Sequence, residues 1–270
     1  MTKRILTVLL LMLVGMPALL FGGLLFYLLT GFFLGVAAWE YVRLYRAVQA
    51  EPSIVLVVGG TLLILTARAF FPEYAMPVLA ILVILAMAVH MLAFERGRDL
   101  AARDFSITLS GLVYVGWIGA YLYDLRALPN GGWWLFIVLG SVWMADSGAY
   151  SIGSAYGKHK MAPRLSPKKS WEGYFAGVFT GAVYGAFLTW AFIQYGPMGG
   201  IITPLEGGLM GLFLSIVAPF GDLGESMFKR QAHIKDSSNL FPGHGGALDR
   251  IDSWLWAAPL GVFLIQLFWL

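Results

Sequence analysis

Long apolar runs recur along nearly the whole chain, and they constrain its fold more than any other feature. They lie near residues 5–22, 24–42, 54–71, 76–94, 107–125, 132–155, 173–195, 207–228 and 253–270. A membrane-spanning helix needs about 20 mostly apolar residues, and in lipid its backbone N–H and C=O groups must be satisfied internally. The sequence therefore predicts an all-α fold, a polytopic transmembrane helical bundle of about nine spans.

The composition excludes an ordinary soluble enzyme. Of the 270 residues, 59% are hydrophobic and 12% are charged, and the mean hydropathy is +0.76. This is more apolar surface than a soluble domain of this length can bury. The absence of cysteine excludes a disulfide framework, a thiolate zinc site and a cysteine nucleophile. Because the net charge is only +3, we expect no nucleic-acid partner, and we expect the lipid bilayer as the surroundings.

The distribution of basic residues predicts the orientation in the membrane. Lys3-Arg4 precedes an apolar run that continues into the second run without a convincing cleavage site, which is typical of a retained signal anchor. With a cytoplasmic N-terminus, only Arg68 and Arg126 of the 18 Lys and Arg residues fall outside. This asymmetry follows the positive-inside rule. We therefore expect a multi-pass protein of the cytoplasmic (inner) membrane whose C-terminus lies outside.

Polar residues are distributed unevenly between the two halves of the chain. Residues 1–130 are mostly apolar, and we expect them to form a hydrophobic transmembrane scaffold. Residues 131–270 contain two longer inner loops, 156–172 and 229–252, which concentrate Lys, Arg, His, Asp, Gly and Pro. The sequence thus predicts one continuous membrane domain, whose C-terminal half is a catalytic region facing the cytoplasm.

Three acidic residues interrupt the apolar spans, namely Asp146, Asp222 and Glu225. A charge at the centre of a membrane helix costs about 2.5–3.5 kcal/mol on insertion scales, so a cation, a metal or a proton path is the expected partner. A structural ion pair with a neighbouring helix is the simpler alternative. On a helix, Ser226 and Lys229 share one face with Asp222 and Glu225. That face combines two carboxylates, a hydroxyl and an ammonium group.

The segment 243–252 contains three glycines, in Gly-His-Gly-Gly, followed by Asp249 and Asp252. Glycine-rich backbone exposes N–H groups that can hold phosphate oxygens. If residues 248–252 are helical, the two carboxylates lie on one face and are suited to Mg²⁺. A glycine turn followed by an acidic first helical turn explains the same pattern without a ligand.

The inner loop 156–172 is basic and ends beside the membrane. Lys168 and Lys169 stand between two hydroxyl residues, in Ser-Pro-Lys-Lys-Ser, where they can neutralise the phosphates of a nucleotide or a lipid headgroup. Charge that only follows the positive-inside rule is the alternative. Among the histidines, His90 lies in an apolar span and is expected to be a satisfied helix residue, whereas His244 lies between glycines and close to carboxylates, in the context of a site.

These polar segments closely resemble the signature of the phosphatidate cytidylyltransferases, also called CDP-diacylglycerol synthases. The resemblance rests on Ser226-Met227-Phe228-Lys229-Arg230, Lys235-Asp236, Phe241-Pro242-Gly243-His244-Gly245-Gly246 and Asp249-Arg250-Ile251-Asp252. Residues 166–173 and the Asp146-Ser147 stretch are also similar to that family, whereas residues 1–130 resemble it only in being hydrophobic. The resemblance implies an enzyme that transfers CMP from CTP to phosphatidate, giving CDP-diacylglycerol and pyrophosphate for phospholipid biosynthesis.

The resemblance also implies the site and its cofactor. Asp222 and Asp249 would bind Mg²⁺, and a second, monovalent cation such as K⁺ is compatible with the family. The other catalytic residues would be Lys229, Arg230, Asp146 and Lys169. The residues expected to bind the two substrates are Lys168, Ser170, Ser226, Lys235, Asp236, His244, Gly245, Gly246, Arg250 and Asp252. A homodimer is the implied assembly.

Two other functions stay open at this point. A CTP-dependent polyprenol or dolichol kinase has a related membrane fold but transfers the terminal phosphoryl group, so that it releases CDP instead of pyrophosphate. A membrane transporter also holds intramembrane Asp and Glu, but it does not need phosphate-type chemistry on one membrane face. The products of turnover separate the first alternative, and flux without nucleotide turnover would favour the second.

Overall fold

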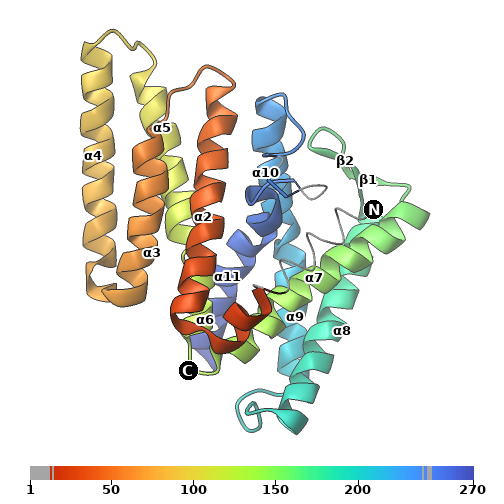
Figure 1. Cartoon of the computed structure of the whole chain (residues 1–270). Coiled ribbons are helices and arrows are strands. Elements are labelled where there is room, and N and C mark those ends of the chain that lie inside the picture. The colour runs from red at the N-terminus through yellow and green to blue at the C-terminus, as the bar shows by residue number, and fades with distance from the viewer. Residues whose placement is uncertain (1–12, 14, 239, 242–244) are drawn as a thin grey trace. The chain divides into compact units, whose positions relative to one another are not determined.

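A computed structural model describes residues 13, 15–238, 240–241 and 245–270. Most of the predicted first span, 5–22, and the predicted site residue His244 lie outside the described residues; within that span, residues 15–21 are helical. The described chain consists of helices and one two-stranded sheet (Figure 1). It divides into two compact units. The first unit comprises Met1–Asp124 and Phe228–Ile251, and the second comprises Leu125–Met227 and Asp252–Leu270.

The first unit is built mainly from four helices. These are α2 (Gly23–Arg46), α3 (Gly60–Phe70), α4 (Ala75–Glu95) and α5 (Ala101–Gly111). The shorter elements are the π-helical segments Val55–Gly59 before α3 and Leu112–Ile118 after α5, the 3₁₀ turn Pro72–Tyr74, and α6 (Tyr121–Ala127), whose last residues belong to the second unit. Helix α2 packs on α3 and α5, and α4 packs on α3 and α5.

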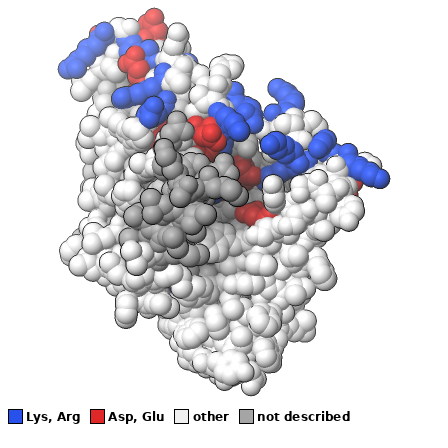
Figure 2. Space-filling model, turned by 45° about the vertical axis from the view of Figure 1, so that its right-hand side comes forward, with Lys and Arg blue, Asp and Glu red and all other residues white. Residues whose placement is uncertain are grey.

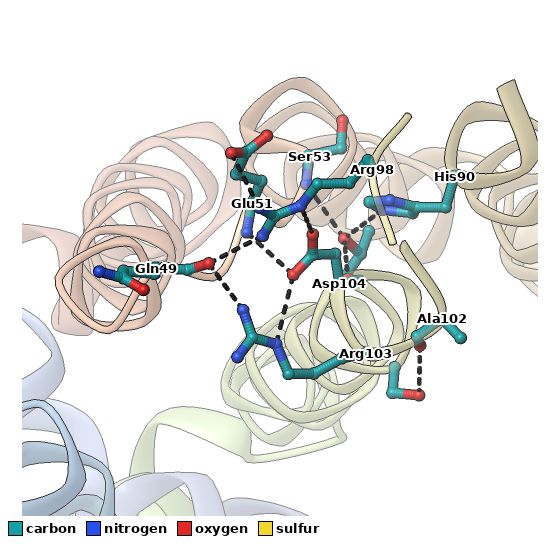
Figure 3. Close-up of polar contacts among 10 residues, drawn as sticks. Gln49, Glu51, Ser53, His90, Arg98, Ala102, Arg103 and Asp104 are labelled. Atoms are coloured by element: carbon teal, nitrogen blue, oxygen red, sulfur yellow. Dashed lines mark hydrogen bonds and ion pairs between the residues drawn. The ribbon is translucent and has the colours of Figure 1, made fainter. Parts of the chain in front are cut away.

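A polar network joins two connections of the first unit (Figure 3). The buried carboxylate of Asp104 accepts hydrogen bonds from Arg98 Nε at 2.7 Å and from the backbone N–H of Glu51 at 3.0 Å. Arg98 and Arg103 also donate to the backbone oxygen of Gln49, at 2.7 and 2.6 Å. The hydrogen bond to Asp104 raises the pKa of the Arg98 guanidinium, so this group stays charged throughout the neutral pH range.

His90 of α4 is buried next to the same network (Figure 3). Its Nε2 lies 2.9 Å from Oγ1 of Thr108, and the Thr108 hydroxyl donates its one proton to the backbone oxygen of Asp104 at 2.9 Å. Nε2 of His90 must therefore be the donor to Thr108. The prediction of a satisfied helix residue is confirmed.

Besides the end of α6, the second unit contains three long helices, a β-hairpin and most of two further helices. Its elements are α7 (Gly131–Tyr156), β1 (Lys160–Ala162), β2 (Ser166–Ser170), α8 (Trp171–Tyr195), α9 (Pro204–Val217), most of α10 (Pro219–Gln231) and most of α11 (Leu248–Phe268). Helix α8 packs on both α7 and α9. The single span predicted over 207–228 lies within one apolar helical segment, in which α9 and α10 are separated by a break at Ala218. Pro219 begins α10, because proline lacks the N–H that would continue α9.

Small residues on one side of α8 determine how closely its neighbours approach. The buried residues of this helix are Gly173, Gly177, Gly181, Gly185 and Thr189. A Cβ atom on Gly177 would lie 2.7 Å from the backbone oxygen of Ala145, and one on Gly181 would lie 2.9 Å from that of Ser141. Only glycine therefore permits this backbone approach between α7 and α8, the close packing that is typical of membrane helices.

The exposed side of α8 carries large apolar side chains. Its exposed residues include Phe175, Phe179, Val183 and Phe187, each at least half exposed. Most of the face drawn in Figure 2 is likewise formed by uncharged residues. A helix that buries glycine and exposes phenylalanine is the reverse of a helix on a soluble protein, and it suits a surface in contact with lipid.

Seven helices of the described residues are long and apolar enough to cross a membrane. They are Gly23–Arg46, Pro72–Glu95, Ala101–Ala127, Gly131–Tyr156, Trp171–Tyr195, Pro204–Gln231 and Leu248–Phe268, and Val55–Phe70 is a shorter apolar helix. The predicted polytopic helical bundle is confirmed. The count of nine spans and the orientation of the termini stay predictions.

Candidate functional site

The inner connection predicted as a loop over 156–172 contains a β-hairpin. Its strands β1 and β2 are antiparallel, with Lys160 opposite Ser170. Next to the hairpin, the carboxylate of Glu172 lies 2.6 Å from Nδ1 of His159 and also accepts a hydrogen bond from the backbone N–H of His159. The predicted inner loop thus contains regular structure, although the sequence analysis did not predict strands there.

The hairpin places the two predicted lysines and Ser170 differently. Lys168 is exposed, whereas the ammonium group of Lys169 forms an ion pair with the carboxylate of Asp222 on α10, with Nζ and Oδ2 2.5 Å apart. Ser170 is buried, and its hydroxyl accepts a hydrogen bond from the backbone N–H of Gly173 at 3.2 Å. Ser170 is therefore the N-cap of α8 in this structure.

Three carboxylates of the second unit converge, and we call them the carboxylate cluster: Asp222 and Glu225 of α10 and Asp252 of α11. One oxygen from each lies within 4.8 Å of the others. Glu225 is buried and the other two are partly exposed. Gly221 makes this approach possible, because a Cβ atom there would collide with the backbone oxygen of Asp252.

The carboxylate cluster has the donor set of a site for a hard cation. The three carboxylates lie close together, and the ammonium group of Lys169 pairs with one of them, Asp222. Like charges at such separations repel strongly unless a cation or protons neutralise them. Oxygen ligands in this number suit Mg²⁺, which uses few carboxylates and takes its remaining ligands from water and phosphate. The residues present therefore fit a divalent metal ion.

A second polar group lies in the first unit, and we call it the Asp249 cluster: Asp249, Lys229, Ser237 and Gly246. Lys229 Nζ donates to Asp249 Oδ1 at 2.6 Å. Asp249 Oδ2 accepts from the backbone N–H groups of Gly246 and Ser237, at 2.8 and 2.9 Å, and from Ser237 Oγ at 2.7 Å. The side chains of Asp249 and Lys229 are 7% and 11% exposed. Burial makes this charge-assisted pair sensitive to loss of either partner.

The backbone before Asp249 is arranged around a glycine in the left-handed region. Gly245 has a φ of 81°, which L-residues with side chains rarely adopt. Its backbone oxygen accepts a hydrogen bond from the N–H of Phe241 at 2.9 Å, and the Phe241 ring stacks on Phe33 of α2 with centroids 5.8 Å apart. Gly245 and Gly246, two of the glycines that the sequence singled out, thus lie directly before α11.

The other predicted residues are distributed over both units. Ser226 is buried, and the exposed ones are Asp146, Arg230, Lys235, Asp236 and Arg250. The structure brings Asp222 together with Asp252 and Lys169, and brings Asp249 together with Lys229 and Gly246. Glu225, which was not among the predicted site residues, joins the carboxylate cluster. The signal for it was its position three residues after Asp222 on one helix.

Comparisons with known proteins decide the family. The profile of the cytidylyltransferase family matches residues 2–268. The chain belongs to this family. A phosphatidate cytidylyltransferase of Pseudomonas aeruginosa is 36% identical over 268 residues, covering 97% of this chain and 96% of the relative. Phosphatidate cytidylyltransferases of Staphylococcus aureus strain COL and of Synechocystis sp. are each 30% identical, with 98% of this chain and at least 97% of each relative covered. The predicted resemblance is confirmed.

Proposed function

We propose that this membrane cytidylyltransferase transfers CMP from CTP to phosphatidate and releases pyrophosphate. Relatives with that name match nearly its whole length. The observation that carries the proposal is the carboxylate cluster, which lies on membrane-type helices and is paired with Lys169. A metal site for a triphosphate and an apolar surface for a lipid are the two features that this reaction requires.

We assign the carboxylate cluster to Mg²⁺. Asp222, Glu225 and Asp252 would hold the ion. Mg²⁺ bound there would neutralise negative charge on the triphosphate and on the departing pyrophosphate. The ion pair between Lys169 and Asp222 orients both groups and keeps a cationic side chain beside the carboxylates. A second, monovalent cation such as K⁺ stays a prediction.

Asp249 serves two purposes in this proposal. Its Oδ2 already accepts three hydrogen bonds, whereas Oδ1 accepts one, from Lys229. Oδ1 is therefore the oxygen with acceptor capacity left for a cation, as the predicted ligand role requires. The same ion pair holds the Lys229 ammonium in one direction, which suits it to orient a substrate phosphate.

The reaction needs no nucleophile from the protein. A phosphate oxygen of phosphatidate attacks the α-phosphorus of CTP, the bond from that phosphorus to the bridging oxygen breaks, and pyrophosphate leaves with the electron pair. The new phosphoanhydride bond joins CMP to the lipid. The attacking oxygen is already deprotonated at neutral pH, so that the chain's residues bind, orient and neutralise charge without moving a proton.

The location and assembly of the enzyme are part of the proposal. The Lys and Arg residues fall mainly in segments assigned to the cytoplasmic side. We infer an active site that faces the cytoplasm in the cytoplasmic membrane, where CTP is available. The homodimer stays a prediction, for which chemical cross-linking in the membrane is the direct measurement.

The products of one incubation test the proposal. Detergent-purified protein is mixed with labelled CTP, phosphatidate and Mg²⁺, with and without EDTA, and both products are identified. We expect CDP-diacylglycerol and pyrophosphate, both lost with EDTA and with Asp222→Asn but not with the control Glu51→Gln, whose carboxylate is exposed. CDP together with a phosphorylated lipid would instead identify a CTP-dependent lipid kinase, and no turnover of CTP would refute both assignments.

A further inference from the structure

Helix α2 carries a buried acidic residue, Glu40, within the part of the sequence predicted to be a hydrophobic scaffold. Its side chain is fully buried, with a relative exposure of 0%. A buried carboxylate is unfavourable unless hydrogen bonds or charges compensate it. Glu40 belongs to neither the carboxylate cluster nor the Asp249 cluster, so its own partners must explain why it is there.

Four donors surround the Glu40 carboxylate, and all of them come from residues 237–248. Oε1 accepts from the hydroxyl of Ser238 at 2.5 Å and from the backbone N–H of Ala247 at 3.0 Å. Oε2 accepts from the hydroxyl of Ser237 at 2.9 Å and from the backbone N–H of Leu248 at 2.8 Å. Each oxygen thus has two donors, which compensates the burial of the charge.

Two of these donors belong to the beginning of α11, which starts at Leu248. The first N–H groups of a helix lack partners inside the helix, and its N-terminus carries a partial positive charge. A carboxylate that accepts from Ala247 and Leu248 satisfies both needs. Glu40 therefore determines where α11 begins and in which direction its first turn, which includes Asp249, is presented.

The same carboxylate is linked to Asp249 through shared neighbours. The hydroxyl of Ser237 lies 2.9 Å from Glu40 Oε2 and 2.7 Å from Asp249 Oδ2, and its one proton is shared between them. The N–H of Gly246 donates to Asp249 at 2.8 Å, while a Cβ atom on Gly246 would collide with both Glu40 and Ser237. Glu40 and Asp249 thus both accept hydrogen bonds from the short backbone segment 246–248.

We propose that Glu40 is a positioning residue that holds Asp249 in its reactive orientation. It acts by fixing Ser237, Ser238 and the first turn of α11, without touching the substrates itself. This inference rests on the proposed function, in which Asp249 is a catalytic residue that directs Lys229. A merely structural role for Glu40 would lower the stability of the whole protein and would leave the turnover of the folded enzyme unchanged.

The test compares Glu40→Gln with Glu51→Gln, an exposed carboxylate of the same unit that contacts neither cluster. Glutamine keeps the shape but presents an N–H₂ group to donors. We expect kcat for CDP-diacylglycerol formation to fall by about 10- to 100-fold, as for loss of a group that orients a ligand, while the KM values for both substrates change by less than about threefold. Glu51→Gln should retain wild-type kcat.

Hydrogen–deuterium exchange supplies a readout that does not depend on activity. In Glu40→Gln, peptides that contain the amides of Gly246, Ala247 and Leu248 should exchange faster, while peptides from α4 and α8 keep their wild-type rates. Wild-type kcat in Glu40→Gln would overturn the inference. Faster exchange spread over the entire protein would overturn it as well, because that result indicates a structural role.

A second variant keeps the test decisive if Glu40→Gln cannot be purified. Ser238 donates to Glu40 and accepts from the backbone N–H of Leu240, and in the described chain it makes no hydrogen bond to Asp249. Ser238→Ala therefore removes a donor to Glu40 without removing a direct partner of Asp249. We expect kcat to fall by about two- to tenfold, and an unchanged kcat would overturn the inference. Absence of CDP-diacylglycerol from the wild type would refute the proposed function itself, and it is seen before any variant is compared.

Discussion

The substitution Asp249→Asn should lower both the stability and the turnover of the protein, because the structure assigns both to this one side chain. Asp249 accepts three hydrogen bonds at Oδ2 and one from Lys229 at Oδ1. Asparagine has one acceptor oxygen, and its best orientation keeps that oxygen toward Gly246 and Ser237. The amide N–H₂ group then faces the Lys229 ammonium, so that a donor meets a donor and the ion pair is lost.

The loss of this pair sets the expected magnitude. One hydrogen bond between charged partners contributes about 1.5–3 kcal/mol, and the Lys229 side chain, 11% exposed, loses this acceptor. We therefore expect the free energy of unfolding to fall by about 1.5–3 kcal/mol. Turnover should fall by about 10²- to 10³-fold, the usual result of removing one group that stabilises charge in the transition state.

The double variant Asp249→Asn with Lys229→Met tests this division. Removing the Lys229 ammonium as well as the Asp249 carboxylate should restore most of the stability, because neither charge of the buried pair is left without the other. It should not restore turnover. The assays are the midpoint of heat-induced loss of the monodisperse peak in detergent and the rate of CDP-diacylglycerol formation. Full turnover in Asp249→Asn would refute the assigned role, and a double variant less stable than the single one would refute the ion-pair argument.

Three further outcomes follow from the second unit. Lys169→Gln removes the ammonium paired with Asp222. We expect Mn²⁺ to bind about two- to fivefold more tightly, as measured by electron paramagnetic resonance, and the KM for CTP to rise. Gly177→Leu presses a side chain against the backbone of α7 and should lower stability by about 3 kcal/mol, measured as a lower heat midpoint. Ser170→Ala removes the N-cap of α8 and should lower stability by about 1 kcal/mol. An unchanged KM for both substrates would show that Ser170 only caps the helix, whereas a raised KM would show that it binds a substrate.

Local patterns were sufficient for much of this protein. The apolar runs predicted the helices because burial in lipid requires about 20 apolar residues in succession, a property of each segment by itself. The spacing of Asp222 and Glu225 predicted a shared helix face for the same reason. The signature residues around 226–252 indicated the cytidylyltransferase family, whose match the comparisons confirm.

Other features depend on partners that are far apart in the sequence. The β-hairpin, the place of Glu225 beside Asp252, and the pairing of Lys169 with Asp222 all require contacts between separate elements. The start of α11 is the clearest case. The apolar pattern predicts it at residue 253, whereas the helix begins at Leu248, because a carboxylate more than 200 positions earlier accepts its first N–H groups.

The sequence by itself therefore determined the membrane class, the approximate helices and the family of this protein. The tertiary structure alone decided which charges meet, and with them the role of Glu40. Hydrophobic periodicity is recorded residue by residue along the chain, but a buried charge is tolerated only where folding brings donors to it. An acidic residue in an apolar run consequently signals that a partner exists, and only the folded chain identifies that partner.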